Sequence, residues 1–166
     1  MKQASVRRLV GAALMAALCC VGTMVLQFPL PGSGYANLGD CFVVLSGLLL
    51  GPAWGAAAGG IGTALADLIS GYGIYAPATL VIKAGMAAAA WGVFRALRKR
   101  TWAAPIAAAV AACIMAGGYF LFELALYGVG TALADIPGNA VQGGVSIVLT
   151  AVLYPAAELA LKRAAK

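Results

Sequence analysis

Charged side chains interrupt the long apolar stretches of this chain at only a few places. Asp40, Asp67, Lys83 and Glu123 lie within or at the edges of such stretches, and Asp135 lies close to another. A charge inside a membrane span costs about 2.5 to 3.5 kcal/mol on insertion scales and usually faces a cavity or an opposite charge. We therefore expect these residues to form ion pairs or to bind a polar ligand.

Uncharged polar and aromatic side chains accompany these charges at similar depths in their segments. An aromatic belt with ordinary interhelical hydrogen bonds would explain any one of them, but their common bias to the outer half of the membrane favours a pocket for a small polar ring compound. Those that recur at helical spacing are Tyr119, Glu123 and Tyr127 in one segment and Asn139, Gln142 and Ser146 in another. The predicted substrate-binding residues are Tyr35, Asn37, Asp40, Asp67, Tyr75, Lys83, Tyr119, Glu123, Asn139 and Gln142.

The residues that are missing exclude several classes of chemistry. The chain has no histidine, and its four cysteines show no CxxC spacing, so neither a zinc site nor a Ser-His pair is available. No GxxxxGK[ST] segment occurs, so the chain has no P-loop, and uphill transport would require an ion gradient or a separate motor. We expect no catalytic residue, no metal and no cofactor.

Lipid is the expected solvent of this chain. Hydrophobic residues make up 63% of its 166 residues and charged residues only 10%, against roughly 25% in ordinary soluble domains. Only helices or closed barrels satisfy the backbone in hydrocarbon, and the abundance of Ala, Leu and Gly favours helices. Residues 1–166 are therefore expected to form a single all-α transmembrane domain, with no nucleic-acid partner despite a net charge of +6.

Six transmembrane helices are predicted from the apolar stretches and the breaks between them. The N-terminal stretch has spanning length and no convincing cleavage site, so it is interpreted as a span and not as a signal peptide. Gly51-Pro52 interrupts the second stretch, which is either one kinked span or two spans joined by a tight turn. The expected apolar stretches cover residues 9–26, 38–69, 78–94, 103–127 and 139–161, and the expected outer loops cover residues 28–37, 71–77 and 128–138.

The distribution of basic residues decides between these alternatives. Basic residues cluster near both termini and in residues 95–100. A single kinked span would place the 95–100 cluster opposite the basic N-terminus, against the positive-inside rule, whereas two spans place every cluster in the cytoplasm. The sequence thus predicts a multi-pass protein of the cell membrane with both termini cytoplasmic and a tight inner turn at Gly51-Pro52.

Small residues mark two helix surfaces. Glycines recur every fourth residue on the third helix, and this ridge ends in Thr63 and Asp67. Lys83 is expected about 10 Å below the outer end of the fourth helix, at a depth similar to that of Asp67, so the two are plausible neighbours. They either pair with each other or contact the ligand, with the tyrosines stacking on its ring. On the first helix, Ala12 and Ala16 form AxxxA, and Ala13 and Ala17 repeat it one residue on.

Three segments carry a resemblance to a known family: GYANLGD at 34–40, LSGLLLGPAWGAAAGGIGTALADLISGY at 45–72 and YAPATLVIKAGMA at 75–87. They resemble the substrate-binding S components of energy-coupling factor (ECF) vitamin importers, in the group named for riboflavin, hydroxymethylpyrimidine or pyridoxine. The resemblance is specific over about residues 29–90 and extends loosely to the rest of the chain.

The resemblance implies six helices and a vitamin site near the outer face. It further implies docking on a shared T component with two ATPase subunits, through the AxxxA that Ala12 and Ala16 match. It does not imply which vitamin or precursor is bound.

Two other functions compete with substrate capture. An intramembrane aspartyl enzyme could use Asp40 and Asp67 as an acid and base pair, but the GxGD signature of such enzymes fails at its first glycine, where this chain has Asn37. A purely structural membrane subunit is the other alternative, and it would have no pocket. The expected protein is not an enzyme.

Overall fold

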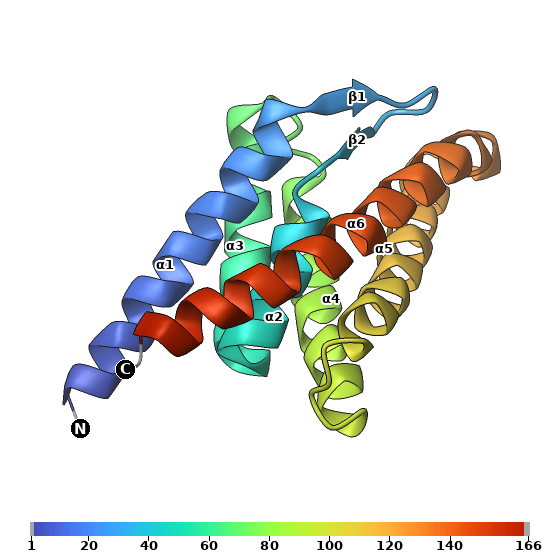
Figure 1. The fold of residues 1–166 in the computed structure, drawn as a ribbon. Coiled ribbons are helices and arrows are strands. Elements are labelled where there is room, and N and C mark those ends of the chain that lie inside the picture. Colours follow the sequence, from blue (N-terminus) through green and yellow to red (C-terminus); the bar gives the residue numbers. More distant parts are fainter. Residues whose placement is uncertain (1, 165–166) are drawn as a thin grey trace.

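The computed structural model describes residues 2–164, and within this range the chain forms six helices and one short β-hairpin (Figure 1). The elements are α1 (Lys2–Val25), β1 (Gln27–Pro29), β2 (Tyr35–Asn37), α2 (Asp40–Leu50), α3 (Pro52–Ile69), α4 (Ala76–Ala96), α5 (Ala103–Tyr127) and α6 (Val129–Ala164). The predicted all-α class and the number of helices are confirmed. The side chains of Lys2 and Lys162, and the whole of Lys166, lie outside the described part.

The outward faces of the helices are apolar, as a lipid environment requires. Leu14 on α1, Leu121 on α5 and Val152 on α6 are each more than 60% exposed. Four segments are long and apolar enough to cross a membrane by length and composition: Val6–Val25, Ala76–Ala96, Ala103–Tyr127 and Val129–Ala160. These helices make the chain a multi-pass membrane protein.

The second apolar stretch divides at the predicted position. Gly51 has φ +86°, a conformation that favours glycine, and Pro52 occupies the first turn of α3, where its missing N–H costs nothing. At 1.5 Å per residue the 11 residues of α2 extend only about 17 Å. This helix is therefore shorter than a bilayer core, and Asp40 at its start lies well inside the bundle.

The glycine ridge of α3 is a surface of close helix contact. A methyl group at Gly55 would lie 2.6 Å from the Gly47 Cα of α2, and one at Gly59 would lie 3.0 Å from Val43 Cγ1. Glycine is required at Gly55 because backbone occupies the space of a side chain. The ridge thus holds α3 against α2 and leads to Thr63 and Asp67 at its outer end.

The predicted loop at 128–138 is wrong, because residues 129–138 belong to α6. Gly128 alone, at φ +85°, separates α5 from α6, and Pro137 is accommodated inside the helix. A single left-handed glycine is sufficient to turn the chain between two antiparallel helices. As a result Asp135 lies one helical turn before Asn139, on the same face of α6.

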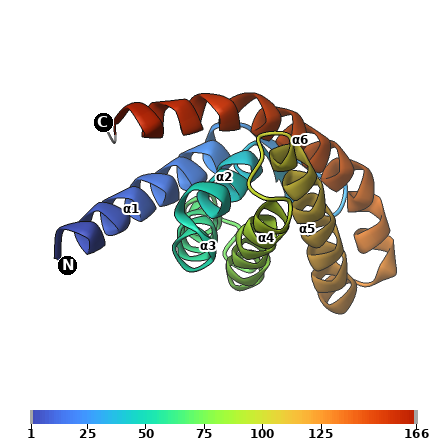
Figure 2. The same ribbon diagram turned by 60° about the horizontal axis from the view of Figure 1, so that its bottom comes forward.

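The two ends of the bundle differ in construction. Figure 1 shows the start of α1, the end of α6 and the α4–α5 turn at one end, whereas the hairpin β1–β2 and the α5–α6 turn lie at the other. In Figure 2 the first of these ends is turned toward the reader. The hairpin is antiparallel, with Phe28 opposite Ala36. It covers the end of the bundle toward which the buried polar residues gather.

The docking surface expected on α1 differs in detail from the structure. Ala12 is only 7% exposed, and Ala16 is half-buried with its backbone against Gly62 of α3. Ala13 and Ala17 are exposed instead. The prediction that Ala12 and Ala16 present the free surface is therefore corrected, since their face of α1 packs inside the molecule.

Candidate functional site

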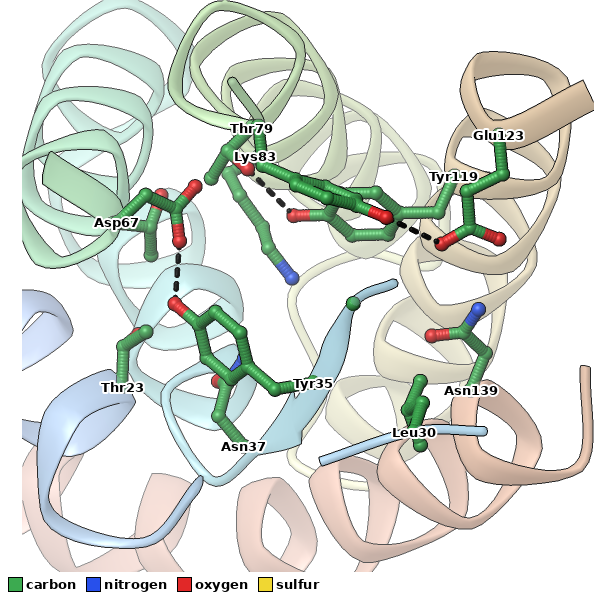
Figure 3. Close-up of a pocket in the computed structure, with 13 residues that line it drawn as sticks. Thr23, Leu30, Tyr35, Asn37, Asp67, Thr79, Lys83, Tyr119, Glu123 and Asn139 are labelled. Atoms are coloured by element: carbon green, nitrogen blue, oxygen red, sulfur yellow. Dashed lines mark hydrogen bonds between the residues drawn. The ribbon is translucent and has the colours of Figure 1, made fainter. Parts of the chain in front are cut away.

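A polar and aromatic pocket lies beneath the hairpin, with about 360 Å³ of empty volume including its mouth (Figure 3). Five helices and the hairpin segment contribute to its walls. The lining residues are Thr23, Leu30, Gly34, Tyr35, Asn37, Thr63, Asp67, Tyr75, Thr79, Lys83, Tyr119, Glu123 and Asn139.

Lys83 forms the floor of the pocket and is paired with Asp40. Both side chains are 1% exposed, and the Lys83 ammonium donates a hydrogen bond to Asp40 Oδ1. Of the two alternatives for Lys83, the ion pair with Asp67 is therefore not formed. Because α2 is short, its first residue, Asp40, lies at the same depth as Lys83, which is two turns into α4. The Lys83 ammonium therefore contacts Asp40 and not Asp67.

Asp40 also connects the floor to α6 and to the hairpin. Gln142 Nε2 donates to Asp40 Oδ2 at 2.8 Å, and Gln142 Oε1 accepts from the Asn37 N–H at 2.8 Å. The side chain of Asn37 in turn accepts from the Gly39 N–H at 2.9 Å. Both the nitrogen and the oxygen of the Gln142 amide thus form hydrogen bonds that hold the floor in place. Asp40 and Gln142 therefore support the pocket from behind.

Asp67 and Tyr35 form one side wall. The Tyr35 hydroxyl donates to Asp67 Oδ1, joining β2 to the end of α3. Burial raises the pKa of the Tyr35 phenol above its usual range, and the hydrogen bond to Asp67 raises this pKa further. The phenol consequently remains protonated and a donor at any physiological pH.

Glu123, Tyr75 and Tyr119 form the opposite wall, with Tyr127 behind Tyr75. The Tyr75 hydroxyl donates to Glu123 Oε1 at 3.4 Å, and the Thr79 and Tyr119 hydroxyls are 2.9 Å apart. The ring of Tyr75 stacks on Tyr127, with ring centres 6.4 Å apart. This wall combines aromatic faces with one carboxylate, an arrangement that suits a flat ring with polar substituents.

Asp135 fixes the turn of the hairpin. It is fully buried, and its carboxylate accepts from the Gly32 N–H at 2.6 Å and from the Gly34 N–H at 3.4 Å. A methyl group at Gly32 would lie 2.6 Å from the carboxylate oxygens, so only glycine allows this approach. The turn that carries Leu30 and Gly34 is thereby held over the pocket.

Several buried oxygens of the pocket have no hydrogen-bond partner among the described residues. Three of these oxygens belong to residues that line the pocket: Thr23 Oγ1, Asp67 Oδ2 and Glu123 Oε2. A buried polar atom without a partner is costly, by about 1 to 3 kcal/mol, and is rare in folded proteins. These three atoms mark positions where a bound ligand would supply hydrogen bonds.

The structure brings most of the predicted site residues together. Eight of the ten line the pocket, and Asp40 and Gln142 lie directly behind it. Sequence reasoning missed some lining residues that a helical-spacing argument could have found, since Thr63 precedes Asp67 and Thr79 precedes Lys83 by one turn. The missed residues are Thr23, Leu30, Gly34, Thr63 and Thr79.

An apolar helical bundle with a polar, aromatic pocket at one end defines a membrane protein that binds a small solute. Residues 3–161 match the ECF-type riboflavin transporter S component family, so the chain belongs to this family. Its members are substrate-binding components of transporters and not enzymes, which removes the intramembrane aspartyl enzyme as an alternative.

Individual relatives agree with this assignment. The thiamine precursor transporter HmpT of Lactococcus lactis subsp. cremoris is 31% identical over 160 residues, covering 95% of this chain and 92% of that protein. An uncharacterized protein of Pyrococcus woesei is 37% identical over 130 residues, covering 78% and 86%. The solved S component of a bacterial ECF transporter has a TM-score of 0.76 at 23% identity, covering 95% of this chain and 99% of that one, which supports the fold.

Proposed function

We propose that this chain captures hydroxymethylpyrimidine, a thiamine precursor, at the outer face of the membrane for an ECF-type importer. The observation that carries the proposal is the pocket beneath the hairpin, where tyrosine rings alternate with carboxylates, a lysine and an amide. A single heteroaromatic ring with amino and hydroxymethyl groups matches this mixture of stacking surfaces and hydrogen-bonding groups. The similarity to a thiamine precursor transporter supports the same substrate.

Pyridoxine and riboflavin-like compounds are the other substrates in question. Pyridoxine is also a single ring with hydroxymethyl groups, so it is the closer competitor. Riboflavin has three fused rings and a sugar-alcohol chain, whereas the empty space of the pocket is only about 360 Å³ even when the open solvent at its mouth is counted. The size of the pocket therefore favours a one-ring compound.

The energy for uptake would come from a T component and two ATPase subunits. The chain has no P-loop of its own, and membership of an S component family supports such partners. We place the docking surface on the exposed face of α1 that carries Ala13 and Ala17, because small side chains let helices of two subunits approach closely.

Equilibrium binding to the purified protein in detergent or nanodiscs tests the substrate. Hydroxymethylpyrimidine should bind more tightly than pyridoxine, and riboflavin should bind weakly or not at all. Tyr35→Phe removes the donor to Asp67 and should weaken binding by about 5- to 30-fold. Tyr154→Phe, beside Phe94 at the other end of the bundle, is the matched control and should bind normally. Tighter binding of riboflavin would contradict the proposal.

A further inference from the structure

The acidic residues of this chain are concentrated at the pocket. Four of its five acids, Asp40, Asp67, Glu123 and Asp135, line the pocket or contact residues that do. The lining includes one basic residue, Lys83, and its ammonium is paired with Asp40. Asp135 is engaged by two backbone N–H groups of the hairpin. Asp67 and Glu123 remain as carboxylates without a dedicated cation among the lining residues.

Both remaining carboxylates are buried and present one oxygen without a partner. Asp67 is 3% exposed and Glu123 1% exposed, and the atoms concerned are Asp67 Oδ2 and Glu123 Oε2. Figure 3 shows the two side chains on opposite walls, with Lys83 between them. A ligand between these walls would reach both.

The two carboxylates differ in the compensation that the protein supplies. Asp67 accepts a hydrogen bond from the Tyr35 hydroxyl and lies in the electrostatic field of Lys83. Glu123 accepts a hydrogen bond from the Tyr75 hydroxyl at 3.4 Å, and its other neighbour is a second carboxylate, Asp135, which supplies no positive charge. Burying an ionised carboxylate without an opposite charge costs several kcal/mol, so Glu123 is the position at which a cationic ligand would be stabilised most.

We propose that the pocket binds its substrate in the protonated form, with Glu123 as the recognising carboxylate. This inference rests on the proposed function, since hydroxymethylpyrimidine is an aminopyrimidine that protonates on a ring nitrogen. The positively charged ring N–H can then donate a charge-assisted hydrogen bond to Glu123 Oε2, the carboxylate oxygen without a partner. Binding of the neutral free compound would thus take up one proton from solvent, and that proton is shared in the pair with Glu123.

Other titratable groups face Glu123, and they set the expected pH range. Tyr75 approaches it from the start of α4, Asp135 from α6, and Tyr119 and Tyr127 lie one turn away on α5 itself. Burial raises the pKa of the Tyr75 phenol above its usual range, so Tyr75 remains neutral over the pH range of the test. Above about pH 7, the dependence of the Kd on pH should therefore report the proton that is taken up with the ligand.

Titration calorimetry of the whole protein with hydroxymethylpyrimidine tests the inference. Between about pH 7 and about pH 9 the Kd should rise about tenfold per pH unit, because one proton is bound with each ligand. At about pH 8, heats measured in two buffers of different ionisation enthalpy should show uptake of about one proton per site in the wild-type protein. This measurement requires no variant, so a failure of Glu123→Gln to fold would not prevent the test.

Substitutions of single carboxylates show which of them pairs with the protonated ligand. Glu123→Gln should abolish the pH slope and weaken binding at least tenfold at about pH 7, since a neutral amide cannot pair with a cation. Asp67→Asn should weaken binding but keep the slope, and Glu158→Gln, at the far end of α6, should change neither. Tight binding with a constant Kd and no proton uptake would overturn this inference alone. Absence of hydroxymethylpyrimidine binding at every pH by a folded protein would overturn the proposed function and this inference with it.

Discussion

At the scale of single residues, Lys83 is the cation on which the pocket depends. Its ammonium pairs with Asp40 and lies 5.2 Å from the centre of the Tyr119 ring. Charge, hydrogen bond and aromatic contact together compensate for burial at 1% exposure. Because Asp40 is also held by Gln142, the position of Lys83 is set by three helices at once.

Substitution of Lys83 tests its ion pair with Asp40 through the stability of the protein. Lys83→Met leaves Asp40 buried without its cation and should lower the free energy of unfolding by about 3 to 5 kcal/mol. Adding Asp40→Asn removes the stranded charge, keeps an acceptor for Gln142 and should restore most of that loss. Chemical denaturation in detergent micelles measures both changes.

The control for this prediction is the alternative pair, Lys83 with Asp67, that the sequence left open. Lys83→Met with Asp67→Asn should not recover stability, because Asp67 is bonded to Tyr35 and not to Lys83. Equal recovery by the two double variants would contradict the assigned ion pair.

At the scale of elements, close backbone contacts position the walls of the pocket. Ser46 on α2 donates to the Gly55 carbonyl of α3 at 2.9 Å, which is possible only where the two helices nearly touch. The hairpin is held in a comparable way, because the backbone N–H groups of Gly32 and Gly34 donate to the Asp135 carboxylate. Both contacts depend on glycines that leave no room for a side chain.

The α2–α3 contact predicts a contrast between two glycine substitutions. Gly55→Ala places a methyl group 2.6 Å from the Gly47 Cα and should destabilise the protein by about 1 to 3 kcal/mol. Gly85→Ala, on α4, meets nothing within 4 Å and should stabilise it by up to about 1 kcal/mol, since alanine is the better helix former. Thermal unfolding midpoints that shift in the same direction for both variants would show that the ridge is not a tight contact.

The hairpin predicts a change in local opening. Asp135→Ala removes the acceptor for the Gly32 and Gly34 N–H groups, so amide hydrogen exchange in residues 30–36 should accelerate at least about fivefold. Ser146→Ala, on the same helix but away from the hairpin, should leave this exchange unchanged. Hydrogen exchange with mass spectrometry reads out both, and equal protection in the two variants would mean that Asp135 does not hold the turn.

At the scale of the whole molecule, the position of the basic residues orients the bundle. The end of α4 and the α4–α5 turn carry four basic residues: Arg95, Arg98, Lys99 and Arg100. This turn lies at the same end of the bundle as the start of α1 and the end of α6, opposite the hairpin (Figure 1). The positive-inside rule assigns this end to the cytoplasm. The pocket would then open to the outside, as capture of an external nutrient requires.

Labelling of a single cysteine tests the orientation. In a variant that lacks the four native cysteines, Lys99→Cys should react with a membrane-impermeant maleimide only after the cytoplasmic side is made accessible. Val129→Cys, at the start of α6, is the opposite-side control and should react in intact cells. Labelling of position 99 in intact cells would reverse the assignment.

Uptake measurements test the docking surface. Ala13→Leu and Ala17→Leu should reduce accumulation of the radiolabelled substrate in cells while leaving its binding to the isolated protein intact, because both positions are exposed on α1. Ala12 is only 7% exposed, so Ala12→Leu should instead destabilise the fold. Full uptake by both exposed variants would exclude this face of α1 from docking.

The sequence by itself determined the class of protein, the number of helices and most of the site. Hydropathy alone is sufficient for the first two, since hydrocarbon admits few alternatives to a helix. The bias of the charged and aromatic residues toward one end located the pocket, because a buried charge must face a partner or a cavity. Gly51-Pro52 marked the α2–α3 turn because both residues have strong backbone preferences.

Only the tertiary structure decided which of these residues meet. Lys83 pairs with Asp40 and not with Asp67 because α2 begins deep in the bundle, a fact that depends on packing and not on spacing along the chain. Asp135 reaches the hairpin because Gly128 turns the chain in one residue and Pro137 is tolerated within α6, against its local preference. The face of α1 that remains free follows from the contact between Ala16 and Gly62 of α3. Local sequence cannot encode such long-range contacts, because they arise from the shapes of two surfaces brought together.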